Sequence, residues 1–207
     1  MLRALLIGNG ETPDAAFLKS LAARADLILA ADGGADRALA GGLTPDVIIG
    51  DLDSVSPAAK KRVSPENLIF VDNQNNTDLE KALDWLVKRG CKACTLTGFA
   101  GGRWDFTLGN FLSVYPYAKK MDLTFAGPGW NFYPVQKNRR FACRPGARVS
   151  LIPLKNCIGV SLKGLKYPLK NARLKLGGTG LTLSNITTGK TFGVEMKSGF
   201  LFVYAED

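Results

Sequence analysis

Short apolar runs alternate with longer amphipathic stretches through the first 125 residues of the chain. The runs predict five β-strands, at residues 3–7, 26–31, 47–50, 68–71 and 95–97. Between them, apolar side chains recur at the spacing of one helix face, as at Phe17, Leu18, Leu21 and Ala22 and at Leu79, Ala82, Leu83 and Leu86. Strands that alternate with helices predict a three-layer α/β/α domain with a mostly parallel sheet.

The pattern changes in the last third of the chain. From Phe141 onward, short apolar runs are separated by Pro-Gly, Lys-Gly and Gly-Gly turn signals, and no long helix is predicted. The runs predict strands at residues 149–152, 159–162, 173–176, 181–183, 191–195 and 200–204. We therefore predict two domains, an α/β domain over residues 1–126 and a small antiparallel β-sandwich or barrel over residues 127–207.

Two carboxylates follow the third predicted strand. Asp51 and Asp53 stand two positions apart after Gly50, and on an extended backbone such residues point to the same face. Open α/β sheets bind ligands at the carboxyl ends of their strands, and paired carboxylates there suit Mg²⁺. The alternative is a solvated loop, with Ser56 and Pro57 beginning the next helix.

Three other segments carry candidate chemistry. Asp32 precedes Gly33 and Gly34, which allow a close backbone approach where a helix begins, although Asp32 also fits a plain N-cap. Thr77 with Glu80 fits a capping box, and Asp78 beside them fits a favourable charge in the first helical turn. The glycine-rich loop 98–105 carries Arg103 just before a helix, which suits polyphosphate or is a flexible loop with a surface arginine.

Composition excludes several classes of protein. The 207 residues contain no apolar run near the ~20 residues that a membrane span needs, so we expect a cytoplasmic protein without a membrane segment. Histidine is absent, which excludes a Ser/His/Asp triad, a histidine base and a histidine metal site. The four cysteines include one CxxC pair that leads into a strand, so we expect ordinary reduced thiols.

Charge is distributed unevenly along the chain. Residues 1–119 hold 13 basic and 14 acidic residues, a net charge of −1, whereas residues 120–207 hold 14 and 4, a net charge of +10. Such asymmetry suggests two regions and an anionic partner, so a nucleic-acid-binding module is one hypothesis, with contacts at Tyr167, Phe192, Phe200 and Phe202. Basic residues on a solvated sheet face over an aromatic core are the commoner explanation.

Two partial motifs fail on spacing. Gly8-Asn9-Gly10 begins a dinucleotide-binding fingerprint, but Pro13 stands at the position of the third glycine. Gly189-Lys190-Thr191 resembles the end of a P-loop, but its first glycine position holds Ser184 and no helix follows.

Several separated signals occur in a specific order. They are Asp32-Gly33-Gly34, Gly50-Asp51-Leu52-Asp53-Ser54, Gln74 with Thr77-Asp78, and Gly101-Gly102-Arg103-Trp104-Asp105. A basic all-β tail follows with Gly164-Leu165-Lys166-Tyr167-Pro168-Leu169 and Leu183-Ser184-Asn185. This combination resembles the thiamine pyrophosphokinase (thiamine diphosphokinase) family over nearly the whole chain.

The resemblance implies transfer of a pyrophosphoryl group from ATP to the thiamine hydroxyl, giving thiamine diphosphate and AMP. It implies an α/β catalytic domain, a β-sandwich domain that binds thiamine, Mg²⁺ and a homodimer with sites shared between subunits, with no role for nucleic acid. The metal ligands implied are Asp51, Asp53 and Asp78. The remaining implied site residues are Asp32, Arg103 and Asp105 for nucleotide and phosphate, Gln74, Ser184 and Asn185 toward thiamine, and Gly33, Gly34, Thr77, Gly101 and Gly102 as further binding residues.

The sequence departs from the family at two positions. Phe106 follows Arg-Trp-Asp where the family often has His or Gln, and Ile186 follows Ser-Asn where an acidic residue is frequent. Either Asp78 or Asp105 suits the orientation of the thiamine hydroxyl, and the sequence does not choose between them. The other hypotheses are a Mg²⁺-dependent, nucleotide-using transferase for another alcohol and the nucleic-acid-binding module.

Overall fold

The computed structural model describes residues 2–178 and 182–207. The chain divides into two compact units, Met1–Pro128 and Gly129–Asp207, which are treated separately below. None of the described helices is both long and apolar enough to cross a membrane.

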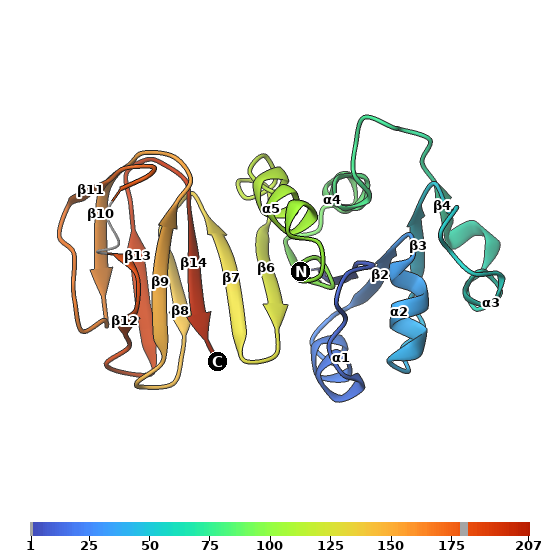
Figure 1. Ribbon diagram of the computed structural model, residues 1–207, viewed down its shortest axis with the longest axis horizontal. Coiled ribbons are helices and arrows are strands. Elements are labelled where there is room, and N and C mark those ends of the chain that lie inside the picture. The colour runs from blue at the N-terminus through green and yellow to red at the C-terminus, as the bar shows by residue number, and fades with distance from the viewer. Residues whose placement is uncertain (1, 179–181) are drawn as a thin grey trace. The chain divides into compact units, whose positions relative to one another are not determined.

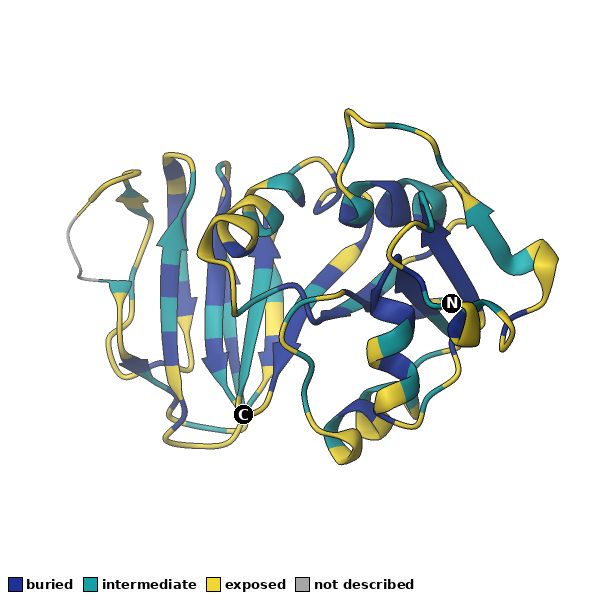
Figure 2. Cartoon of the chain, turned by 45° about the vertical axis from the view of Figure 1, so that its right-hand side comes forward, coloured by how far each residue is buried: buried dark blue, intermediate teal, exposed yellow. Residues whose placement is uncertain are grey.

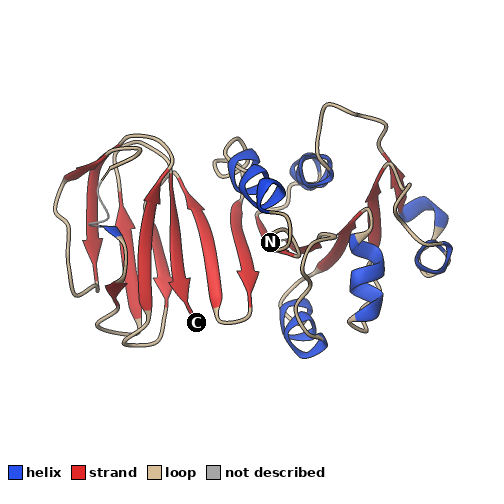
Figure 3. Ribbon diagram, viewed as in Figure 1, coloured by secondary structure: helices blue, strands red, loops and turns tan. Residues whose placement is uncertain are grey.

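The first unit alternates strands and helices, as the apolar pattern predicts (Figures 1 and 3). Its elements are β1 (Arg3–Ile7), α1 (Ala15–Ala22), β2 (Leu27–Ala31), α2 (Gly34–Ala40), β3 (Val47–Gly50), α3 (Pro57–Lys60), a 3₁₀ turn (Pro65–Asn67), β4 (Leu68–Phe70), α4 (Asp78–Lys88), β5 (Ala93–Thr97), α5 (Trp104–Ser113) and β6 (Asp122–Gly127).

The strands of the first unit form a parallel sheet in the order β6-β5-β1-β2-β3-β4. Helices α1 and α2 cover one face of this sheet, and α4 and α5 cover the other (Figure 1). The chain adds β2, β3 and β4 on one side of β1 and then returns to place β5 on its other side. This reversal creates a topological switch point between β1 and β5, where α/β sheets bind ligands.

Burial in the first unit follows from the helical cover on both faces (Figure 2). Four of the five residues of β1 and all four residues of β3 are buried. Parallel strands in such a setting are apolar throughout rather than alternating, which explains the short uninterrupted runs in the sequence. Helix α4 buries the predicted stripe of Leu79, Ala82, Leu83 and Leu86.

Two of the predicted helix N-caps are confirmed, and a third is wrong. Thr77 and Glu80 form both halves of the capping box, and Ser56 caps α3 with Pro57 at its first position. Asp32 is not an N-cap, because α2 begins at Gly34 and its capping position, Gly33, has no side chain to offer. Asp32 therefore needs another role.

The second unit consists of two antiparallel sheets (Figure 1). Their orders are β12-β9-β14-β7 and β11-β10-β13-β8. The strands are β7 (Trp130–Val135), β8 (Arg139–Ala142), β9 (Arg148–Pro153), β10 (Cys157–Lys163), β11 (Ala172–Leu174), β12 (Asn185–Ile186), β13 (Thr191–Glu195) and β14 (Leu201–Glu206). One cluster of buried side chains draws on both sheets, so this unit is a β-sandwich.

The strand pattern of the second unit needs correction at several places. Strands β7, β8 and β12 are not predicted by the sequence pattern. Of the strand expected at 181–183, residue 181 lies outside the described residues, and Thr182 and Leu183 are not extended, because the chain turns before β12. The turn includes Ser184, whose φ of 57° lies in the left-handed region.

Candidate active site

A pocket of about 670 Å³ opens at the switch point of the first unit. Its walls come from loops that follow β1, β2 and β5 and from the first turns of α4 and α5. This volume is in the range of small-molecule sites. The lining residues are Gly8, Asn9, Gly10, Glu11, Thr12, Ala31, Asp32, Arg37, Ser54, Thr77, Asp78, Leu79, Gly98, Phe99, Gly101, Gly102, Arg103, Phe106, Thr107 and Asn110.

Glycines bring the loops after β1 and β5 into backbone contact at the pocket floor. The Gly8 N–H donates to the Thr97 carbonyl and the Gly10 N–H to the Gly98 carbonyl, each at 2.8 Å. A Cβ added to Gly8 would lie 2.6 Å from the Gly98 oxygen, and one added to Gly98 would lie 2.6 Å from the Gly8 oxygen. The Gly8-Asn9-Gly10 segment is thus explained by packing between two loops.

Gly33 and Gly34 have a similar reason to be glycine. A Cβ on Gly34 would lie 2.2 Å from the Ile7 carbonyl oxygen, and one on Gly33 would lie 2.4 Å from the Asn9 amide nitrogen. Glycine at these positions is therefore explained by close contact with the end of β1, whereas the sequence predicted a close approach to a ligand. Neither glycine lines the pocket, and their contact with nucleotide stays a prediction.

Three carboxylates converge beside the pocket. Asp32 follows β2, Asp51 and Asp53 follow β3, and each offers an oxygen such that all three lie within 4.8 Å of one another. Adjacent strands bring them together, because the Asp32 N–H donates to the Ile49 carbonyl at 2.9 Å. The family resemblance implied a nucleotide role for Asp32, and the structure adds this residue to the acidic cluster.

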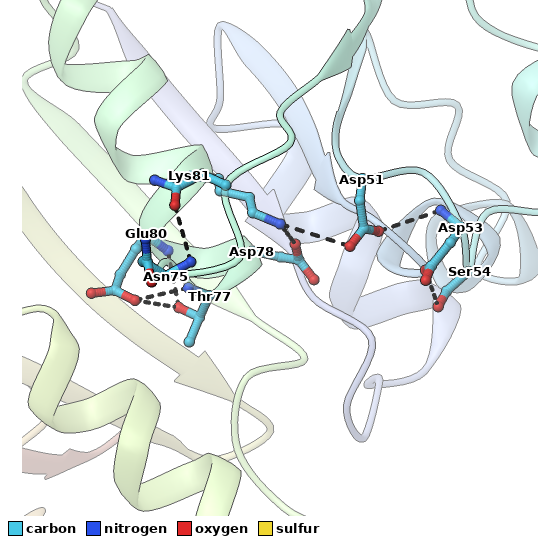
Figure 4. Close-up of polar contacts among 9 residues, drawn as sticks. Asp51, Asp53, Ser54, Asn75, Thr77, Asp78, Glu80 and Lys81 are labelled. Carbon is cyan, nitrogen blue, oxygen red and sulfur yellow. Dashed lines mark hydrogen bonds and ion pairs between the residues drawn. The ribbon is translucent and has the colours of Figure 1, made fainter.

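The convergence of Asp51 and Asp53 arises from a turn rather than from an extended strand. Strand β3 ends at Gly50, and Leu52 has a φ of 62°. The Asp53 N–H then points back to the Asp51 carboxylate at 3.4 Å, as in an Asx turn (Figure 4). The same-face argument for an extended backbone is therefore wrong in its geometry, although both side chains do approach one cluster.

Asp32 is the buried member of the cluster. Only 6% of the residue is exposed, and its Oδ1 atom has no hydrogen-bond partner within residues 2–178 and 182–207. Burial raises the pKa of Asp32, and the negative charges of Asp78 and Asp51 raise it further, against hydrogen bonds from Gly33 and Ser54. A buried, unpaired oxygen beside two more carboxylates suits a hard divalent cation.

Asp78 lies at the start of α4 and is paired with a lysine. The Lys81 Nζ atom is 3.0 Å from Asp78 Oδ1 and 3.9 Å from Asp51 Oδ2 (Figure 4). Burial lowers the pKa of Lys81, but the hydrogen bond and the charge of Asp78, with the charges of Asp51 and Asp32, outweigh it and raise the pKa. Asp78 therefore lies at the edge of the cluster, and its role as a metal ligand stays a prediction.

The Arg103 guanidinium lies at the pocket wall and contacts two near neighbours. It donates to both oxygens of Asp105, at 3.2 and 2.5 Å, and this pairing lowers the pKa of the Asp105 carboxyl. Its Cζ lies 4.2 Å from the centre of the Phe106 ring. Phe106 thus supplies a cation–π surface where the family often has a polar group.

The loop that carries Arg103 is fastened to the rest of the unit. The Gly101 N–H donates to the Thr107 hydroxyl at 3.1 Å, and the Gly102 N–H donates to the Glu11 carboxylate at 2.9 Å. Both glycines have positive φ, 90° and 63°. The loop is therefore held by hydrogen bonds rather than being a loose connection.

None of the residues predicted to face thiamine, Gln74, Ser184 and Asn185, lines this pocket. Gln74 is exposed in the loop before α4 and does not line the pocket, whereas Thr77 does. Asn185 is buried in the second unit, where its Oδ1 accepts from the Tyr167 N–H at 3.0 Å and its Nδ2 donates to the Tyr167 carbonyl at 2.7 Å. The Asn185 amide is thus occupied by structural hydrogen bonds, while Ser184 is exposed.

Sequence reasoning missed several residues that line the pocket. They are Asn9, Glu11, Thr12, Arg37, Ser54, Thr107 and Asn110. Most of them follow the carboxyl end of a strand or begin the next helix, so the position of the predicted strand ends was the available signal.

The aromatic residues of the second unit do not suit nucleic-acid binding. Phe192, Phe200 and Phe202 are at most 2% exposed, so they pack in the core and cannot stack on bases. Among the four aromatic residues of that hypothesis, only Tyr167 is exposed. The commoner explanation of the sequence pattern, an aromatic core under a basic surface, fits these positions.

Comparisons with known proteins agree on one family. A model of the thiamin pyrophosphokinase catalytic domain matches residues 18–125, and a model of the thiamin pyrophosphokinase vitamin B1 binding domain matches residues 134–201. Thiamine pyrophosphokinase of Bacillus subtilis (strain 168) is 29% identical over 173 residues, covering 77% of each chain. Thiamine pyrophosphokinase 3 of Oryza sativa subsp. japonica is 29% identical over 227 residues, covering 94% of this chain and 83% of the relative.

The fold agrees with the same family. The crystal structure of thiamine pyrophosphokinase from Bacillus subtilis matches with a TM-score of 0.83 at 23% identity, covering 99% of this chain and 98% of that chain. The structure from Candida albicans also has a TM-score of 0.83, at 21% identity, and covers 99% of this chain. With both domain models matched in order along one chain, this protein belongs to the thiamin pyrophosphokinase family.

Proposed function

We propose that this chain transfers the pyrophosphoryl group of ATP to the hydroxyl group of thiamine, giving thiamine diphosphate and AMP. The observation that carries the proposal is the pocket at the switch point between β1 and β5, which joins an acidic cluster to the guanidinium of Arg103. Membership of the thiamin pyrophosphokinase family supports the choice of substrates.

Mg²⁺ is the proposed cofactor, and the acidic cluster suits it. The donors are all carboxylate oxygens, and Asp32 contributes one that is buried without a partner. We assign Asp32, Asp51 and Asp53 to hold the ion, with Asp78 beside them. Bound there, Mg²⁺ would neutralise negative charge on the phosphates of ATP.

The other residues of the pocket would bind ATP and orient the reacting groups. The planar fork of Arg103 matches two oxygens of a phosphate, and ATP would take the place of Asp105 as its partner. Asp105, whose pKa is lowered by Arg103 only while the two are paired, is then released and becomes available near the reacting groups. Transfer of this kind depends mainly on positioning and charge neutralisation, so a chain without histidine is competent for it.

We assign thiamine binding to the second unit. The model of the vitamin B1 binding domain matches there, and a cavity of about 580 Å³ lies among β9, β11 and the segment at Leu183. Its lining is mostly apolar, with Leu151, Ile152, Leu174, Leu176 and Leu183, and it also includes the basic residues Arg173 and Lys175. Ser184 is the exposed polar residue next to Leu183 and is the proposed contact for the substrate.

The reaction is tested by measuring AMP release from ATP with and without thiamine. The proposal expects release that depends on both thiamine and Mg²⁺, and a fall in turnover of at least about a hundredfold in Asp51→Asn and Asp53→Asn. Glu66→Gln is the matched control, because Glu66 is exposed and lies outside the pocket. AMP release that does not depend on thiamine would reject thiamine as the substrate. Normal turnover of the folded Asp51→Asn and Asp53→Asn variants would reject these residues as metal ligands.

We also propose a homodimer in which each site uses the first unit of one subunit and the second unit of its partner. Asp51→Asn and Ser184→Arg should each be nearly inactive alone, the second because the long arginine side chain would occupy the place proposed for thiamine. After subunit exchange, roughly half the dimers are mixed, and one of the two sites in each carries neither change. Recovery of about a quarter of the wild-type activity supports sharing, and no recovery in proven heterodimers contradicts it.

The proposal places the enzyme in the cytoplasm. The supporting observation is that Cys91, Cys94, Cys143 and Cys157 are free thiols. Burial raises the pKa of Cys94 well above its ordinary value, which keeps that thiol protonated and unreactive.

A further inference from the structure

Lys81 is a charged residue of helix α4 that is buried although it lies away from the helix's apolar stripe. The other buried residues of α4 are Leu79, Ala82, Leu83 and Leu86, all apolar. Only 4% of the Lys81 side chain is exposed. A lysine is seldom buried so fully, and an apolar residue at this position would pack without the cost of removing an ammonium group from water. Packing therefore does not explain the charge.

The ammonium group of Lys81 points toward the acidic cluster. Its Nζ atom contacts Asp78 at 3.0 Å and Asp51 at 3.9 Å, and these carboxylates are 39% and 27% exposed (Figure 4). Asp51 follows β3, whereas Asp78 begins α4, so one buried amine links two separate segments of the site. Asp51 in turn shares the three-carboxylate cluster with Asp32 and Asp53.

Lys81 has two opposite electrostatic effects at the acidic cluster. Four carboxylates lie close together there, those of Asp32, Asp51, Asp53 and Asp78, and Lys81 is the cation paired with Asp51 and Asp78. It lowers the repulsion among these carboxylates in the protein without metal. The same ammonium repels any divalent cation that enters the cluster, because both are positive and close.

We propose that Lys81 is a positioning residue that fixes Asp51 and Asp78 and weakens the binding of free divalent cations to the acidic cluster. ATP carries negative phosphates that offset this repulsion, so the cation enters with the nucleotide instead of remaining bound alone. The effect on turnover rests on the proposed function, whereas the effect on cation binding does not.

The test is a titration of the metal-free protein with Mn²⁺ alone, followed by electron paramagnetic resonance. In Lys81→Met the dissociation constant should fall on the order of tenfold, because one close positive charge has been removed. In Lys81→Arg, which keeps the charge, it should stay within about threefold of the wild-type value. Lys88→Met is the matched control, because Lys88 is an exposed lysine two turns along the same helix.

Turnover should change in the opposite direction to cation affinity. With saturating ATP, thiamine and Mg²⁺, kcat of Lys81→Met should fall about a hundredfold because Asp51 and Asp78 are misplaced, with Lys81→Arg restoring part of the loss. Tighter Mn²⁺ binding together with slower turnover supports the proposal. A residue with only a structural role would weaken both, and a residue with no role would change neither.

An unchanged or larger Mn²⁺ dissociation constant in folded Lys81→Met overturns the proposal. If that variant does not fold, Lys81→Gln carries the same test, since glutamine keeps a hydrogen-bond donor and removes only the charge. Failure of both to fold also overturns it, because Lys81 would then be needed for folding. Wild-type protein that binds Mn²⁺ as expected but releases no thiamine-dependent AMP rejects the proposed function and leaves this inference standing.

Discussion

Replacement of Gly34 by alanine should destabilise the first unit, although alanine is a better helix former than glycine. The added Cβ would lie 2.2 Å from the carbonyl oxygen of Ile7 and 2.9 Å from its carbonyl carbon. Both atoms are backbone atoms of β1, whose neighbours β2 and β5 hold it on either side. The start of α2 must therefore move away from the strand.

The size of the effect follows from two opposing contributions. Forcing an extra methyl group into a packed interior costs about 1–3 kcal/mol. Alanine recovers at most about 1 kcal/mol relative to glycine in a helix, and less at the first helical position. We therefore expect the free energy of unfolding of Gly34→Ala to fall by about 2 kcal/mol.

Urea unfolding followed by tryptophan fluorescence measures this change, and Gly109 offers a matched control. Gly109 lies within α5, and a Cβ built on it meets nothing within 4 Å. Gly109→Ala should raise the free energy of unfolding by about 0.5–1 kcal/mol. If Gly34→Ala is as stable as the wild type, the start of α2 moves freely, and the contact with β1 is not the reason for glycine at this position.

Four further predictions follow from single side chains. Thr77→Ala should lower the free energy of unfolding by about 1 kcal/mol through loss of the capping box, and an unchanged urea midpoint would contradict this. Arg103→Lys should lower kcat/KM for ATP at least about tenfold with unchanged stability, because an ammonium does not replace the planar fork; equal kinetics would make Arg103 a surface residue. Asn185→Ala should cost about 1–3 kcal/mol, because the Tyr167 N–H and carbonyl lose their partner, and a stable variant would show that water replaces the amide. Burial raises the pKa of Asp32, so folding favours the neutral form of this carboxyl group. Asp32 therefore stabilises the metal-free fold below the ordinary carboxyl pKa, and this stabilisation is lost as the pH rises through the raised value. Asp32→Asn should remove this part of the pH dependence of the free energy of unfolding, measured by urea titrations. An unchanged pH dependence in the variant would show that another group titrates.

The sequence predicts those parts of the fold that depend on local patterns. Strands of the first unit are short apolar runs because helices cover both faces, and the Thr77 capping box needs only residues within one turn. The missed strand β7 contains Pro134, which lacks an N–H and argues against a strand in the sequence, although it pairs with Phe202 of β14. Strand β8 begins with two arginines and has only four residues, too few for a clear pattern.

The parts of the site that depend on strand order are not visible in the sequence. Asp32 joins Asp51 because β2 lies beside β3, and no local pattern states that adjacency. The left-handed conformation of Leu52, which changes how Asp51 and Asp53 converge, is equally hidden, because leucine seldom adopts it. Lys81 is hidden as well, because it lies away from the apolar stripe of α4 and only the three-dimensional structure shows that it is buried.

The reciprocal contact between Gly8 and Gly98 determines when the pocket can form during synthesis of the chain. The two glycines are separated by 90 residues, yet each occupies space that a side chain on the other would need. A contact of such long range forms only after the intervening strands have been made and ordered. During synthesis from the N-terminus, the pocket at the switch point therefore cannot close until β5 and the loop after it have left the ribosome. ATP, the ligand proposed for that pocket, would then stabilise the nascent chain only from this point of synthesis onward.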